Sequence, residues 1–448
     1  MCLMTLGCWA KWAFYARLIH VLVGYTVPMA ETLKFIHSAD LHLGAPFRGL
    51  RKVSGPWAER LMRAIPEAYE RMIQAALDNR VDFVIIAGDS FDLSNPTYRE
   101  YLCFLQGLER LREAGIPVYM ITGNHDPLSG WRSVYGNLPD NVQVFPADAP
   151  GFLLYERDGE PKAVLAGRSW SHQSWPENVS VAEGITRDVA LTSLRVRVPF
   201  CIGVLHTGLD IDPARAPVSP KQLEAAGMDY WALGHIHTPR QNSRRNPSIC
   251  FSGCLQGRAT KETGPHGVNL VTLTEGEPNK VTFIPTASVV YEKVKVDISG
   301  LSTVSQIVQE TRQALFRVNA TSQCDEMIER IVLTGATSLH HILQQPGVME
   351  DLRLAINDAY NKFFCDVLED RTKPLMSKKS LRKEGLLPAT LLQVADEAKD
   401  AKDGDIEYLQ QRFFEKGLYL PRACERKIDR LQDEAEALVL DLLEGGKL

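Results

Sequence analysis

Five short apolar segments in the first 240 residues share one pattern: each ends in Asp, Asn or His side chains. They are LKFIHSADLH (33–42), VDFVIIAGDSFD (81–92), PVYMITGNHD (117–126), FCIGVLHTG (200–208) and DYWALGHIH (229–237). Apolar runs of this length, bounded by Gly and polar residues, predict buried β-strands. A buried strand that delivers a charge at its tip needs a partner for that charge, because an isolated ion is costly to bury.

Amphipathic segments separate the first three predicted strands. Residues 59–80 and 99–115 carry apolar side chains at helical spacing, and Gly115 closes the second segment. The order β-α-β-α-β predicts parallel strands that are buried on both faces. Ligands of such sheets bind beyond the carboxyl ends of the strands. We therefore expect the polar strand ends to meet at one edge of a sheet.

Strand-like segments return between about residues 246 and 295. SICFSGC, GVNLVTLT, KVTFIPT and VVYEKVKVDI predict a second sheet that closes the first domain as a sandwich. Beyond Gly300, VSQIVQETRQALFRV indicates a helix, ERIVLTGAT a strand, and LHHILQQPGVMEDLRLAINDAYNKFF a helix broken at Pro346-Gly347. The predicted fold class is α/β: a two-layer β-sandwich flanked by helices, with a smaller α+β domain and a helical C-terminal tail.

The expected domain limits follow from these segments. We expect the sandwich over residues 31–298, the α+β domain over 299–375 and a helical region over 376–448. Within the last region, KDAKDGD (399–405) is expected to be an exposed linker, and residues 426–446 an amphipathic helix.

Residues 1–30 are expected to be an extension of the fold. Lys11 and Arg17 interrupt the apolar start of the chain, and no clean run reaches the ~20 residues that a membrane helix needs. We expect translation to begin at Met29, and we expect no membrane partner.

Composition limits the class of partner and the compartment. The formal net charge is −5, so a nucleic-acid partner would have to be held by local patches or metal ions. The nine cysteines form no CxxC pair, which favours buried reduced thiols in a cytoplasmic protein over a zinc knuckle.

The polar strand ends carry metal-binding side chains. The candidates are Asp40, His42, Asp89, Asn124, His206, His235 and His237. Oxygen and nitrogen donors without a thiolate suit Mn²⁺ and, less exclusively, Fe²⁺ or Zn²⁺. Seven donors are too many for one ion, but they suit two ions that share a bridging carboxylate, for which Asp89 is the natural choice. Each motif alone has an ordinary reading as a turn or a helix cap, whereas their repetition favours a metal site.

The motifs DLH, GDSFD, GNHD, VLHTG and GHIH, in this order, resemble the signature series of the calcineurin-like metallophosphoesterases over roughly residues 33–285. The resemblance implies a two-layer sandwich with a dimetal centre. It implies that one ion is held by Asp40, His42, Asp89 and His237, and the other by Asp89, Asn124, His206 and His235.

The same resemblance assigns roles around the ions. It makes His125 the group that protonates the leaving oxygen or steadies the transition state, with Asp126 as an orienting partner. The side chain of Asp92 would fix a ligand His from behind.

A narrower resemblance comes from HSADLHLGAPF (37–47) and LQGRATKETGPHGVNLV (255–271), which are similar to bacterial SbcD-like DNA repair exonucleases, especially the YhaO-like branch. It implies a Mn²⁺-dependent nuclease that works on DNA as a homodimer, with a capping domain after residue 300. It also implies a C-terminal helical region that docks an SMC-type coiled-coil ATPase. A His often follows Gln-Gly-Arg in that branch, whereas this chain has Ala259.

Cations lie in the loops expected at the rim of the site. They are Arg48, Arg51, Lys52, Arg240, Arg244, Arg245, Arg258 and Lys261. We expect Arg48 and Arg258 to bind substrate phosphates, although any single one of these cations is an ordinary solvated charge in the alternative reading. Two other functions stay open: a phosphodiesterase or phosphatase of small molecules or nucleotides, and a non-catalytic adaptor of an ATPase.

Overall fold

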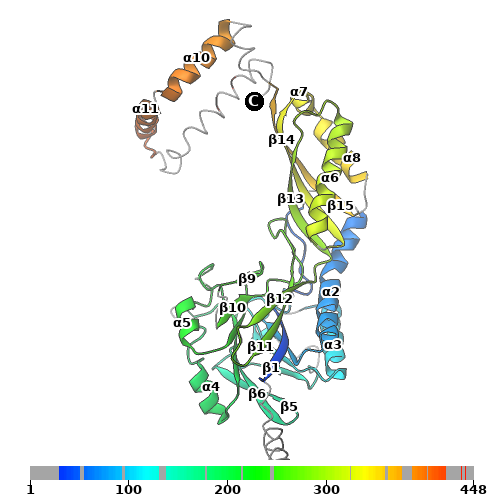
Figure 1. The fold of residues 1–448 in the computed structure, drawn as a ribbon, viewed down its shortest axis with the longest axis vertical. Coiled ribbons are helices and arrows are strands. Elements are labelled where there is room, and N and C mark those ends of the chain that lie inside the picture. The colour runs from blue at the N-terminus through cyan, green and yellow to red at the C-terminus, as the bar shows by residue number, and fades with distance from the viewer. Residues whose placement is uncertain are drawn as a thin grey trace, which may run out of the picture. The chain divides into compact units, whose positions relative to one another are not determined.

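The computed structural model describes most of the chain between residues 30 and 419 (Figure 1). The described ranges are 30–50, 55–92, 96–130, 138–176, 179–212, 215–242, 247–322, 324–358, 362–375, 386–400 and 402–419, with positions 435 and 439. The expected extension over residues 1–28, and all but two positions of the expected terminal helix, lie outside them. Backbone contacts divide the chain into two compact units; the main division falls between Ser288 and Val289, and the short segment Gly49–Ser54 is grouped with the second unit.

The first unit contains two six-stranded sheets. The first sheet has the order β12-β11-β1-β2-β3-β4 and consists of β1 (Thr32–Ser38), β2 (Phe83–Ala87), β3 (Val118–Ile121), β4 (Val142–Val144), β11 (Gly267–Thr274) and β12 (Lys280–Pro285). The second has the order β5-β6-β7-β8-β10-β9 and consists of β5 (Gly151–Arg157), β6 (Glu160–Gly167), β7 (Phe200–His206), β8 (Tyr230–Gly234), β9 (Arg240–Gln241) and β10 (Ser248–Phe251). The predicted parallel pairing of β1, β2 and β3 is confirmed.

Helices cover the outer faces of both sheets. The first sheet packs against α2 (Gly55–Asp78) and α3 (Tyr98–Glu113), and the second against α4 (Arg187–Leu194) and α5 (Pro220–Ala225). A short 3₁₀ helix, η1 (Leu128–Gly130), follows β3. The two inner faces form a shared core.

Strand β2 shows why the central segments carry no polar residue. Val84 and Ile86 pack in the core beneath α2 and α3, whereas Phe83, Ile85 and Ala87 lie in the core between the sheets. All five side chains are fully buried. A strand that is buried between two apolar layers therefore has a continuously hydrophobic sequence.

Three of the four strands expected to build the second sheet lie elsewhere. Strands β11 and β12 extend the first sheet, because β11 pairs antiparallel with β1. Only β10 joins the second sheet, beside β8. The prediction that the segments from 246 to 295 together close the sandwich was therefore wrong, since apolar alternation identifies a strand but not its neighbour.

The second unit is a three-stranded parallel sheet with helices. It consists of β13 (Val289–Asp297), β14 (Glu326–Thr337), β15 (Phe363–Pro374), α6 (Val304–Ser322), α7 (His340–Leu343) and α8 (Val348–Asp358). Strand β13, which we expected in the sandwich, pairs with β14 instead. The predicted helix break is confirmed, since Gly347 lies between α7 and α8 with a φ of 90°.

Two helices follow in the tail, α10 (Leu386–Asp400) and α11 (Lys402–Glu415). The linker expected over residues 399–405 is wrong, because its described residues end α10 and begin α11. Over the described residues, no helix combines the length and the apolar character needed to cross a bilayer.

Candidate metal centre

Loops at the carboxyl ends of the parallel strands carry the seven predicted metal ligands to one place. Asp40 and His42 follow β1, and their backbone N–H groups donate to the carbonyl oxygens of Gly88 (3.0 Å) and Asp89 (3.0 Å) in the loop after β2. His235 follows β8, and its N–H donates to Asp40 Oδ2 at 2.9 Å. These bonds join the ends of strands from both sheets, so the ligands meet across the top of the sandwich.

Four of the seven candidate ligands have left-handed backbone conformations. The φ angles are 51° at Asp40, 46° at His42, 52° at Asp89 and 99° at His235. Non-glycine residues seldom adopt positive φ, because Cβ approaches the backbone, and such conformations gather at functional sites. The loops thus turn back sharply at the residues whose side chains face the centre.

Glycines precede three of the ligands because the backbone has no room for a side chain. A Cβ on Gly88 would meet the His206 ring, one on Gly123 would meet the Asp89 carboxylate, and one on Gly234 would meet the Ala87 carbonyl oxygen. The glycines of the GD, GN and GH motifs therefore permit the close approach of neighbouring strand ends.

Two histidine rings form the first cluster with Asp40. The Nε2 atoms of His42 and His237 lie 3.1 Å apart, at 3.8 and 3.9 Å from Asp40 Oδ1. The opposite nitrogen of each ring faces a carboxylate: His42 Nδ1 lies 3.3 Å from Asp92, and His237 Nδ1 lies 2.6 Å from Glu262. Each Nδ1 is therefore placed to donate to its carboxylate, and that tautomer would direct the Nε2 lone pair toward the cluster.

Two further rings meet at the amide of Asn124. His206 Nε2 and His235 Nδ1 lie 3.1 and 3.2 Å from Asn124 Oδ1. His206 Nδ1 is 2.9 Å from the Ala87 carbonyl oxygen, and burial keeps this ring out of contact with solvent. This second cluster therefore also turns ring nitrogens and an amide oxygen toward one another.

Asp89 lies between the two clusters. Its Oδ2 is 3.8 Å from His42 Nε2 and 3.4 Å from His206 Nε2, while its Oδ1 accepts the backbone N–H of His125 at 2.9 Å. A carboxylate in this position can bridge two cations.

The donor set fits divalent cations. The Nε2 atoms of His42 and His237 lie at hydrogen-bonding distance, 3.1 Å, and burial lowers the pKa of His42 to about 4, so this ring is neutral near pH 7 and offers a lone pair. At His206, burial opposes the charge, but the Asp89 carboxylate outweighs it and raises the pKa to about 9. Asp89 is itself held ionised: burial opposes this charge, yet His206 lowers its pKa. Two buried carboxylates and four ring nitrogens need positive charge among them, and cations supply it.

His125 and Asp126 have separate surroundings. His125 Nδ1 lies 3.0 Å from the carbonyl oxygen of Asp92, and its side chain is 41% exposed, which leaves Nε2 accessible. Asp126 is buried and accepts the backbone N–H groups of Ser90 and Gly123, both at 2.8 Å. Burial, with Asp89 nearby, raises the pKa of Asp126 to about 8. Asp126 thus connects the loops after β2 and β3. The His125 ring contacts the carbonyl oxygen and the carboxylate of Asp92.

The cationic side chains expected at the rim of the site differ in burial and in their partners. Arg258, expected to bind phosphate, is mostly buried, and its Nη1 lies 2.7 Å from Asp92 Oδ1. Arg48 is exposed, and its backbone N–H donates to the Arg258 carbonyl oxygen at 2.8 Å. Arg240 pairs with Asp210 at 3.6 Å. The expected contributions of Arg51, Lys52, Arg244 and Arg245 fall outside the described residues.

Sequence reasoning missed two acidic residues that contact ligand rings. Glu262 accepts from His237, and Asp212 Oδ2 lies 3.3 Å from His235 Nε2. Neither belongs to a motif that ends a strand, so the pattern that identified the ligands passes over both. The only signal was the position of Glu262 in a loop that also carries Arg258 and Lys261.

An open cavity of about 370 Å³ gives access to the centre. It is lined by Asp89, His125, His235, Ile236, His237, Thr238, Lys261 and Glu262. Lys261 is exposed at its wall and forms no ion pair with any described residue.

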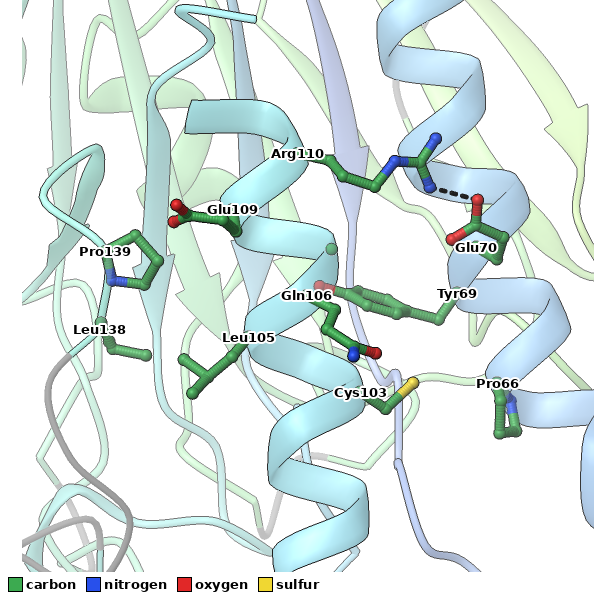
Figure 2. Close-up of a pocket in the computed structure, with 11 residues that line it drawn as sticks. Pro66, Tyr69, Glu70, Cys103, Leu105, Gln106, Glu109, Arg110, Leu138 and Pro139 are labelled. Atoms are coloured by element: carbon green, nitrogen blue, oxygen red, sulfur yellow. Dashed lines mark hydrogen bonds and ion pairs between the residues drawn. The ribbon is translucent and has the colours of Figure 1, made fainter. Parts of the chain in front are cut away.

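A larger cavity of about 710 Å³ lies between α2 and α3 (Figure 2). Its cation, Arg110, pairs with Glu70, and burial raises the pKa of the Cys103 thiol, which keeps it protonated. This cavity therefore lacks the convergent donors found beside Asp89 and is not a candidate for the same chemistry.

Comparisons with known proteins agree with this geometry. Residues 33–239 match the calcineurin-like phosphoesterase family, and residues 291–373 match the middle domain of the metallophosphoesterase YhaO. The chain is 34% identical to YhaO of Bacillus subtilis over 338 residues, which cover 74% of this chain and 78% of that protein.

More distant relatives are DNA double-strand break repair proteins named Mre11. The protein of Methanosarcina mazei is 26% identical over 67% of this chain and 47% of its own length. That of Thermoplasma acidophilum is 24% identical over 69% of this chain and 79% of its own length. The chain thus spans about half of the first and most of the second.

Proposed function

Because the chain belongs to the calcineurin-like metallophosphoesterases of the YhaO type, we propose that it is a dimetal nuclease that hydrolyses phosphodiester bonds of DNA during repair. Membership of this family confirms the prediction from the five strand-end motifs, and it makes the chain a phosphoesterase. The observation that carries the nuclease proposal is the convergence of the two ligand clusters on Asp89 beside an open cavity.

We assign the ligands as the clusters divide them. Asp40, His42 and His237 hold one ion, Asn124, His206 and His235 hold the other, and Asp89 bridges. Oxygen and nitrogen donors favour Mn²⁺ for both positions. When bound, the two ions lower the pKa of water and neutralise charge on the phosphate.

We assign His125 as the general acid that protonates the leaving oxygen. Its Nδ1 lies 3.0 Å from the Asp92 carbonyl oxygen, its side chain is 41% exposed, and the residue lines the cavity. A protonated Nε2 donates its proton to the departing oxygen as the P–O bond breaks. The assigned ligand set does not include His125, which leaves its ring for this transfer.

Support for DNA as the substrate comes from the relatives and from the cavity rim. Several relatives are named as DNA double-strand break repair proteins. Lys261 lines the cavity, and Arg48 is exposed close to the Arg258 loop. Two cations at the rim suit the phosphates on either side of a scissile bond.

We also propose the partners that the narrower family resemblance implies. The protein acts in the cytoplasm as a homodimer, and its C-terminal region, from about residue 376, docks an SMC-type ATPase.

The test is hydrolysis of defined DNA duplexes and single strands by the full chain with Mn²⁺. We expect Asp89→Asn to lose both Mn²⁺ binding and cleavage, since the bridging charge is removed. Asp158→Asn is the matched control, because Asp158 has a similar φ of 55° in an exposed turn. Cleavage by Asp89→Asn at the wild-type rate would refute the dimetal mechanism.

A second candidate substrate is a small phosphodiester or nucleotide, which the modest volume of the cavity favours. Comparing DNA with a chromogenic diester separates the two: activity on the diester alone would replace DNA as the proposed substrate. The non-catalytic adaptor is disfavoured, because all seven ligand positions are occupied by suitable donors.

A further inference from the structure

We propose that Glu262 is a positioning residue of the metal centre, which fixes His237 from behind and ties it to the loop that carries Arg258. This inference rests on the proposed dimetal function, because it concerns how one of the two ions is held. Glu262 lies outside the five strand-end motifs and would not touch an ion itself when it engages His237 in this way.

The contact between Glu262 and His237 determines which ring nitrogen faces the centre. Glu262 Oε1 lies 2.6 Å from His237 Nδ1, and the Glu262 side chain is 11% exposed. A buried carboxylate at this distance accepts the Nδ1 proton and leaves the Nε2 lone pair directed at His42 and Asp40. Without it, the ring is free to rotate about its side-chain bonds or to take the other tautomer.

The second oxygen of the carboxylate holds the loop. Oε2 accepts the backbone N–H groups of Arg258 at 2.6 Å and Ala259 at 3.1 Å. One side chain thus connects the ligand after β8 to a loop more than twenty residues further along the chain. These bonds also keep the carboxylate from turning away, because both of its oxygens are engaged.

The other end of the same loop supports the partner ring. Arg258 Nη1 reaches Asp92 Oδ1 at 2.7 Å, and that oxygen lies 3.3 Å from His42 Nδ1. The loop is also paired with the segment after the first motif, since Arg48 N–H donates to the Arg258 carbonyl oxygen. His42 and His237, whose Nε2 atoms face one another, are therefore both held from behind through residues 258–262.

This arrangement has a consequence for only one of the two ions. Glu262 acts on His237, whereas His206, Asn124 and His235 are held by the Ala87 carbonyl, by one another and by Asp212. Loss of the Glu262 carboxylate should therefore weaken the ion held by His42 and His237 and spare the other. A residue that only stabilised the loop would affect neither ion, or both together through unfolding.

The experiment is Mn²⁺ titration of the ion-free full chain by calorimetry, with circular dichroism to check folding. The variants are Glu262→Gln, His237→Ala and the double variant, with Glu277→Gln as the control for the same change in an exposed turn. We expect Glu262→Gln to weaken one of the two sites by about 10–100-fold, the usual effect of removing a residue that orients a ligand. We expect Glu277→Gln to leave both sites unchanged.

The double variant separates positioning from other effects. If Glu262 acts mainly through His237, Glu262→Gln costs less Mn²⁺ affinity in the His237→Ala background than in the wild type. Additive losses, or a Glu262→Gln protein with both sites intact, would overturn the inference. If Glu262→Gln does not fold, Glu262→Asp, which keeps the charge but shortens its reach, must weaken the same single site; two intact sites there would also overturn it.

The same proteins separate this inference from the proposed nuclease activity. DNA hydrolysis by the wild type is measured in parallel with the titrations. A wild type that binds two ions, one of them sensitive to Glu262, but cleaves no DNA, supports the positioning role and contradicts the proposed function. If the wild type cleaves DNA but Glu262→Gln changes neither Mn²⁺ affinity, the result supports the proposed function and contradicts the positioning role.

Discussion

At the scale of single residues, the metal centre depends on which nitrogen of each histidine ring already has a hydrogen-bonding partner. The rings of His42, His206 and His237 each have one nitrogen engaged by a carboxylate or a carbonyl oxygen. The remaining nitrogens face the two clusters, those of His42 and His237 the first and that of His206 the second. His125 differs, because its side chain is 41% exposed and lines the cavity.

This difference predicts separate effects of removing His125 on binding and on chemistry. His125→Ala should lower kcat on DNA by about 10²–10⁴-fold, as expected for a lost general acid, while both Mn²⁺ affinities stay unchanged. The loss should be smaller on a p-nitrophenyl diester, whose leaving group needs little protonation. Steady-state kinetics on both substrates, with calorimetry of Mn²⁺ binding, test this. Equal losses on the two substrates would argue against proton donation.

A second residue-scale prediction concerns Glu329 in β14. It is fully buried, neither carboxylate oxygen has a hydrogen-bond partner among the described residues, and burial raises its pKa well above the usual value. The folded state therefore keeps a proton that the unfolded state releases above about pH 4.3. Stability should be full below that pH and fall as pH rises, by at most about 1.4 kcal/mol per pH unit, until the folded pKa is passed.

Glu329→Gln should remove this slope. Between pH 5 and 9 the variant should become progressively more stable than the wild type, because the neutral amide has no proton to lose. Urea unfolding read by pulse proteolysis, with fragment masses that identify residues of the second unit, measures the difference. Parallel pH profiles for the two proteins would contradict the account.

At the scale of elements, strand ends could be predicted from sequence, but strand neighbours could not. The seven ligands were identified because apolar runs end abruptly in Asp, Asn and His, and the structure brings them together. Strand β13 was misplaced because its alternation fits either sheet, and only pairing with β14 decides. Glu262 was missed for a related reason: its partner, His237, lies in a different segment of the chain.

The strand-end glycines give a prediction at this scale. Gly234→Ala should destabilise the first unit by about 1–3 kcal/mol and weaken Mn²⁺ binding, because the new Cβ meets a backbone oxygen of β2 that cannot move aside. Gly55→Ala, at the start of α2, meets no described atom within 4 Å and should be neutral or slightly stabilising. Thermal unfolding and Mn²⁺ titration compare the two variants. Equal stability and equal Mn²⁺ affinity of the two would contradict this prediction.

At the scale of the whole molecule, the chain consists of two units with separate cores. All seven candidate ligands lie in the first unit, and the second contributes the parallel sheet that matches the middle domain of YhaO. Binding of cations should therefore stabilise one part of the chain only.

We expect Mn²⁺ to raise the unfolding free energy of the first unit alone. An ion at a hundred times its Kd contributes about 2.7 kcal/mol per site, and chelation should reverse the gain. Hydrogen exchange read by mass spectrometry, with and without Mn²⁺, distinguishes peptides of β1–β12 from those of β13–β15. Equal protection of both sets by the ion would mean that the units unfold together.

The positive φ angles of Asp40, His42, Asp89 and His235 decide how these positions are best probed. Alanine at such a position removes the donor and also disfavours the bent backbone, so a loss of activity has two causes that cannot be separated. Asparagine tolerates the left-handed region better than most residues and keeps the shape of the aspartate. Alanine substitutions at these positions would therefore overstate how much each donor contributes to metal binding and activity. Asp→Asn substitutions change the charge and leave the backbone conformation in place.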